Sequence, residues 1–134
     1  MRSLGFVCAG LLLFALPFLS LGVGGHVHDA TGPHLDHWPR HGGQLMMVGD
    51  SHLEIVDAPP AIEVYASDAR RWPLTPRSAR VALDGTPPRP LDWERGRLVA
   101  PAAPDWRNAA VEVTLPGGQV LAVSVARADI GGGR

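Results

Sequence analysis

Residues 110–125, AVEVTLPGGQVLAVSV, decide the fold class of this 134-residue chain. Apolar and polar residues alternate on both sides of the turn residues Pro116-Gly117-Gly118. Two alternating runs around a Gly-rich turn indicate a β-hairpin. The apolar faces expected on its two strands are Val111, Val113 and Leu115 on the first and Leu121, Val123 and Val125 on the second. The strongest pattern in the chain is therefore antiparallel β structure.

Shorter alternating runs precede this hairpin. They cover residues 52–56, 61–65, 80–83 and 97–99, with a further strand expected from Gln44 and many Pro and Gly residues in between. No segment carries a capped apolar stripe with helical spacing. Many short strands separated by turns predict an all-β fold, a small antiparallel β-sandwich that is immunoglobulin-like or barrel-like. We assign residues 41–127 to this domain and residues 128–134 to a disordered tail.

The first 25 residues have the pattern of a secretory signal peptide. A short basic start is followed by an almost wholly apolar run over residues 4–23, and small residues lie near its end. An uncleaved membrane anchor is the alternative, because about 20 apolar residues can span a bilayer. We therefore expect a periplasmic or secreted protein that contacts the membrane only if the leader is retained. Cys8, the one cysteine, would leave with the leader, so neither a disulfide nor a thiolate ligand is expected afterwards.

Residues 26–40 are polar and interrupted by Gly and Pro, which predicts a flexible His-rich arm. The whole chain carries 12 basic residues against 13 acidic ones, which is close to balance. Nothing in this composition points to a nucleic-acid partner or to a polybasic membrane patch.

All six histidines lie in the first half of the chain, directly behind the leader. Histidine is the commonest metal ligand, so the pattern favours a metal-binding function. Cleavage after Gly25 would place a free amine two residues before His28, a nitrogen set that suits Cu(II) or Ni(II), with His26 as an additional ligand. The alternative is a solvated linker. His34 and His37 would extend the arm as a low-affinity metal collector.

An ordered metal site is expected where the arm meets the first strands. Strand alternation places His52 and Glu54 on one face, about 7 Å apart. His41 precedes Gly42-Gly43, where the backbone can bend tightly, and a hairpin from Gln44 would bring His41 towards the second strand. Two histidines and a carboxylate suit zinc or copper. The alternative is a polar strand face on which Glu54 forms an ordinary ion pair.

Met46 and Met47 would point to opposite faces of the first strand, so at most one lines the histidine-bearing surface. A thioether beside imidazoles suits Cu(I) or Ag(I), whereas a Met that fills a gap in the core is the simpler interpretation. The chain contains no nucleophile elbow, phosphate loop or dinucleotide motif. We therefore favour a binding protein over an enzyme.

One family resemblance covers roughly residues 40–74. It rests on His41-Gly42-Gly43, Gly49-Asp50, Leu53-Glu54-Ile55-Val56, Val64-Tyr65 and Arg71-Trp72-Pro73-Leu74. This segment resembles the small N-terminal β domain of periplasmic adaptor proteins of heavy-metal efflux systems. The resemblance implies a periplasmic β domain associated with metal resistance, with an efflux-system protein or other envelope protein as a partner. The helical hairpin of those adaptors has no counterpart in this chain.

A second resemblance concerns short histidine motifs. His26-Val27-His28, Gly32-Pro33-His34, His41-Gly42-Gly43 and Gly49-Asp50 resemble, in order, ligand-loop fragments of copper/zinc superoxide dismutases. The intervals differ, and no late histidine is present to complete a copper site.

Together these patterns predict an exported protein that binds copper or zinc in heavy-metal tolerance or trafficking. The ordered ligands would be His41, His52 and Glu54. Binding should weaken below a pH of about 6.5, because imidazole ligates only in its neutral form. The alternatives are a non-metal interaction module of the cell envelope and, less favoured, an enzyme similar to superoxide dismutase.

Overall fold

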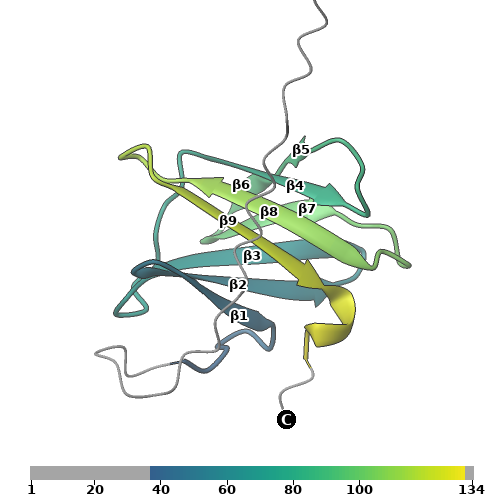
Figure 1. Cartoon of the computed structure of the whole chain (residues 1–134), viewed down its shortest axis with the longest axis horizontal. Coiled ribbons are helices and arrows are strands. Elements are labelled where there is room, and N and C mark those ends of the chain that lie inside the picture. The colour runs from purple at the N-terminus through teal and green to yellow at the C-terminus, as the bar shows by residue number, and fades with distance from the viewer. Residues whose placement is uncertain (1–36, 132–134) are drawn as a thin grey trace, which may run out of the picture.

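The computed structural model describes residues 37–131, which form two antiparallel β-sheets (Figure 1). The first sheet has the strand order β1-β2-β3-β7-β6. Its strands are β1 (Gln44–Val48), β2 (Ser51–Ala58), β3 (Ala61–Asp68), β7 (Arg97–Pro101) and β6 (Asp92–Glu94). The second sheet has the order β5-β4-β8-β9. Its strands are β5 (Arg89–Pro90), β4 (Ser78–Leu83), β8 (Asn108–Thr114) and β9 (Val120–Ala126). The predicted all-β sandwich is confirmed.

The hairpin predicted from residues 110–125 is formed by β8 and β9. Val113 lies opposite Leu121 and Val111 lies opposite Val123, as expected if the apolar faces of both strands share one side. The backbone N–H of Leu115 donates to the carbonyl of Gln119 at 2.8 Å and closes the Gly-rich turn. The chain passes from the first sheet to the second between β3 and β4, returns to the first between β5 and β6, and enters the second again between β7 and β8.

The strands near the histidines also follow the sequence pattern. β1 and β2 form a hairpin whose tip is Gly49-Asp50, and Pro59-Pro60 forms the turn between β2 and β3. Gly49 has φ of +60°, a left-handed conformation that favours glycine. The register of β2 between its two neighbours fixes which side chains lie over the outer face of the first sheet.

The core lies between the two sheets. Leu53, Ile55 and Val64 from the first sheet and Val81 and Val111 from the second are almost fully buried. Each such side chain contributes about 1.5–3 kcal/mol through its removal from water. At one edge of the sandwich, β9 lies against β1 and β2 of the other sheet. This core fixes β2, the strand that carries His52 and Glu54.

After β9 the chain forms a short 3₁₀ helix, η1 (Arg127–Asp129), drawn in yellow in Figure 1. Ile130 packs against the core, although the sequence predicts a tail from residue 128 onward. Among residues 37–131, no helix is long and apolar enough to cross a membrane. The predicted signal peptide, most of the predicted arm and residues 132–134 lie outside the described residues.

Candidate functional site

His52 and Glu54 share the outer face of β2, as strand alternation predicts, but both are buried there. Their exposed fractions are 0 % and 1 %. The outer face of a two-layer sandwich normally contacts water, so this burial requires a cover. Residues 37–43 supply it, because they run over β2 and contact both side chains.

The Glu54 carboxylate is surrounded by donors from that covering segment. Its Oε1 accepts the backbone N–H groups of His41 at 2.7 Å and of Gly43 at 3.1 Å. Its Oε2 accepts the backbone N–H of Arg40 at 3.0 Å. Burial by itself raises the pKa of Glu54. The three N–H donors and the His41 ring lower the pKa by more than burial raises it, so the pKa of Glu54 lies below its usual value. Glu54 is therefore ionised at neutral pH.

His41 is held in place by two contacts. Its Nδ1 lies 3.0 Å from Oε2 of Glu54, and its ring stacks on Tyr65 with the centroids 3.6 Å apart and the planes 5° from parallel. Because the carboxylate is ionised, Nδ1 donates the hydrogen bond. This arrangement fixes the tautomer of His41 and the orientation of its ring, and the side chain remains 41 % exposed.

Arg71, in the turn that follows β3, also contacts the Glu54 cluster. Its guanidinium is buried, lies 3.6 Å from Oε2 of Glu54 and donates to the carbonyl of Trp38 at 2.9 Å. In return, Arg40 donates from its side chain to the carbonyl of Arg71 at 3.2 Å. The covering segment is thus linked to the sheet through both the carboxylate and this arginine.

His52 has different neighbours from Glu54. Its Nδ1 donates to the backbone carbonyl of Asp68 at 3.0 Å, which fixes the tautomer in which Nε2 carries the lone pair of the neutral ring. Its ring centroid lies 6.3 Å from that of His37, with the planes tilted by 56°. Folding thus brings together two imidazoles that are 15 positions apart in the chain.

The structure divides the predicted ordered ligands into two groups. His41 joins Glu54, and His52 joins His37. Among residues 37–131, no three His, Cys, Asp or Glu side chains are grouped so that they could hold a metal ion. Both oxygens of Glu54 already accept hydrogen bonds, which fits a residue that orients His41 rather than one that binds an ion. His26, His28 and His34 lie outside the described residues, and metal ligation by the predicted set stays a prediction.

Gly42 and Gly43 explain the local path of the covering segment. Gly42 has φ of +79°, which lets the chain turn into β1. A Cβ on Gly43 would lie 2.2 Å from the carbonyl oxygen of Ile55, because the backbone passes directly over β2 there. The two glycines therefore let the backbone pass close enough to β2 for the N–H groups of Arg40, His41 and Gly43 to reach Glu54.

Tyr65 and Arg71 belong to this site, although no ligand or catalytic motif in the sequence marks them as functional. Tyr65 lies opposite Glu54 in the register of β2 and β3, and Arg71 has φ of +66° in the turn that follows β3. Both fall within the segment that carries the family resemblance. Their contacts depend on the alignment of three strands, which local alternation does not fix.

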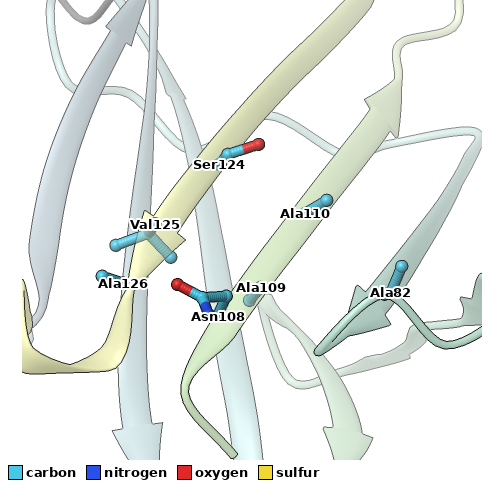
Figure 2. Close-up of a pocket in the computed structure, with 8 residues that line it drawn as sticks. Ala82, Asn108, Ala109, Ala110, Ser124, Val125 and Ala126 are labelled. Atoms are coloured by element: carbon cyan, nitrogen blue, oxygen red, sulfur yellow. The ribbon is translucent and has the colours of Figure 1, made fainter. Parts of the chain in front are cut away.

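A shallow hollow lies elsewhere, on the second sheet, and has a volume of about 250 Å³ (Figure 2). Its lining is small and uncharged: Ala82, Gly85, Asn108, Ala109, Ala110, Ser124, Val125 and Ala126. It contains no acid, base or metal-ligating carboxylate, imidazole or thiol, and no base lies in the lining to activate the hydroxyl of Ser124. The polar cluster on the first sheet is the better candidate site.

No protein family, curated protein or solved structure matches this chain.

Proposed function

We propose that this chain is an exported metal-binding protein, specific for copper or zinc, that acts in periplasmic heavy-metal tolerance or trafficking. The observation that supports this most is the pair of imidazoles from His37 and His52, whose ring centroids lie 6.3 Å apart. His52 donates from Nδ1 to a backbone carbonyl and His41 donates to a carboxylate. Metal-ligating histidines usually make such contacts, because they fix the tautomer and orient the ring.

The separation of the two rings suits a shared ion. With metal–nitrogen distances of about 2.0–2.1 Å, the centroids of two ligating imidazoles lie about 5 Å apart at a tetrahedral angle and about 6.4 Å apart in linear coordination. The centroids of His37 and His52 lie 6.3 Å apart, which is near the linear value. In this proposal Glu54 orients His41, and His26, His28 and His34 collect metal on the arm.

The function is tested by calorimetric titration of the exported protein with Zn(II) and Cu(II) near neutral pH. We expect at least one ion to bind with a Kd below about 10 μM. A variant with His26, His28 and His34 replaced by Asn should keep one site, and a further His37→Asn replacement should remove it. Failure of the unmodified protein to bind Zn(II), Cu(II) and Ag(I), the last standing in for Cu(I), would refute a function in metal handling.

A non-metal interaction module of the cell envelope is the second candidate. It is favoured by two large apolar side chains beside the cluster, because Trp38 is 76 % exposed and Trp72 is 69 % exposed. Arg71 contacts the backbone of Trp38 and directly precedes Trp72. Exposed tryptophans are enriched in interface hot spots.

Paired variants separate the two functions. His41→Ala with His52→Ala should abolish ordered metal binding, whereas Trp38→Ala with Trp72→Ala should leave it intact. The interaction module predicts the opposite dependence for a partner cross-linked in the cell envelope. Circular dichroism of each variant shows whether the β fold is retained.

A further inference from the structure

Met47 lies directly opposite His52 on the neighbouring strand. The register of β1 and β2 pairs Met47 with His52 and Met46 with Leu53. Leu53 is fully buried and Met46 packs against the core, so that pair faces the interior. Successive residues of a strand face opposite sides, so Met47 and His52 share the outer face.

This register places a thioether beside the imidazole of His52. Residues that are directly opposed in an antiparallel pair have Cβ atoms about 4.5–5.5 Å apart. Methionine has three rotatable side-chain bonds and adapts its sulfur position readily. The ring centroid of His37, from the covering segment, lies 6.3 Å from that of His52. Three segments thus bring two imidazoles and one thioether to one end of the β1–β2 hairpin.

Two carboxylates near His52, those of Glu54 and Asp68, are engaged in other contacts. Glu54 accepts the backbone N–H groups of the covering segment. Oδ1 of Asp68 accepts the backbone N–H groups of Arg70 at 2.8 Å and of Trp72 at 2.9 Å. Oxygen ligands are what hard cations need, whereas thioether and imidazole ligands suit soft ions.

We propose that His37, Met47 and His52 form a binding site for a soft monovalent ion, Cu(I) or Ag(I). The inference rests on the proposed metal-binding function and specifies the ion class of its ordered site. Met47 supplies the selectivity, because thioether sulfur is a ligand that soft ions select. His52 supplies a ring whose orientation is fixed by Asp68, and His37 joins from the covering segment.

The chain provides a matched control for this site. Met46 and Met47 are neighbours in β1, but Met46 faces the core. A Met→Leu substitution roughly conserves volume and removes only the sulfur, so both variants should fold. All proteins in the experiment carry Asn in place of His26, His28 and His34, which removes the arm histidines as competing ligands.

The probe is Ag(I), which has the ligand preference of Cu(I) and does not undergo redox cycling. Calorimetry should show that Met47→Leu lowers the affinity for Ag(I) by at least about tenfold and that Met46→Leu leaves it unchanged. In a ¹³C-methyl NMR titration, the methyl resonance of Met47 should shift and saturate at one equivalent, while that of Met46 stays in place.

Two results would overturn the inference without touching the proposed function. These are retention of Ag(I) affinity in Met47→Leu, or an equal loss in Met46→Leu, while Zn(II) or Cu(II) still binds. Absence of binding for all three ions would instead refute the proposed function, and the inference with it.

Discussion

At the scale of single residues, Glu54 shows how a charge is accommodated in a place that strand geometry alone would expose. A buried carboxylate is costly unless hydrogen bonds replace its lost hydration. Here three backbone N–H groups, the ring of His41 and the guanidinium of Arg71 surround it. The carboxylate and its covering segment therefore depend on each other.

Glu54→Gln should destabilise the fold by about 2–4 kcal/mol. Glutamine keeps the shape, but it loses the charge that faces Arg71 and turns an NH₂ donor towards backbone N–H donors. Glu112→Gln provides the comparison, because the pair formed by Glu112 and Arg80, 2.7 Å apart, is partly exposed. That change should cost no more than about 1 kcal/mol.

Urea denaturation followed by tryptophan fluorescence measures both variants. Equal stabilities for Glu54→Gln and Glu112→Gln would show that the donors around Glu54 do not compensate a buried charge. The expected order is wild type, then Glu112→Gln, with Glu54→Gln clearly the least stable.

The lowered pKa of Glu54 also gives the stability a pH dependence. Its stabilising contribution is fully present above the unfolded value of 4.5 and is lost as the pH falls through the lower folded value. We expect the unfolding free energy of the metal-free protein to decrease below pH 4.5, and to decrease less steeply in Glu54→Gln. Urea denaturation across this range, with a chelator present, tests the point. Parallel curves for the two proteins would contradict it.

At the scale of elements, the two glycines before β1 perform different tasks, so their alanine variants should differ. Gly42→Ala forces a side chain into a left-handed backbone with open space around it, at a cost of about 1–2 kcal/mol. In Gly43→Ala the new Cβ would meet the backbone of Ile55 at 2.2 Å, so the segment must lift from β2.

Lifting the segment would remove the N–H donor of Gly43 from Glu54, so we expect Gly43→Ala to cost more than about 2 kcal/mol. Hydrogen exchange should then show lost protection at residues 40–43. Gly42→Ala serves as the control, with protection retained at these positions. A larger loss of stability in Gly42→Ala than in Gly43→Ala would contradict this account.

The sequence predicted the strands better than the site. Alternation and turn residues located the hairpin of β8 and β9 and the run around Leu53, because both patterns are local. It also placed His52 and Glu54 on one face. It did not predict that residues 37–43 cover that face, because this depends on contacts with Arg71, 31 positions from Arg40. Pairing His52 with His37 likewise required the path of the folded chain.

At the scale of the whole molecule, a polar link joins the first sheet to the segments that flank β8 and β9. Asp57, in β2, accepts a hydrogen bond from Nε1 of Trp106 at 3.2 Å and from Nε of Arg127 at 2.6 Å. The Arg127 guanidinium also lies 5.5 Å from the centroid of the Trp106 ring. Trp106 is almost fully buried, so this link closes the end of the sandwich at which η1 begins.

A double-mutant cycle on Asp57 and Trp106 measures this link. Asp57→Ala should lower the unfolding free energy by about 1–3 kcal/mol, because it leaves the indole N–H and the guanidinium without their carboxylate. Trp106→Phe removes the indole donor and retains an aromatic ring. Since the two side chains are in direct contact, their effects should be non-additive by about 0.5–1.5 kcal/mol in urea denaturation. Strict additivity would mean that the hydrogen bond between Asp57 and Trp106 contributes nothing measurable to stability.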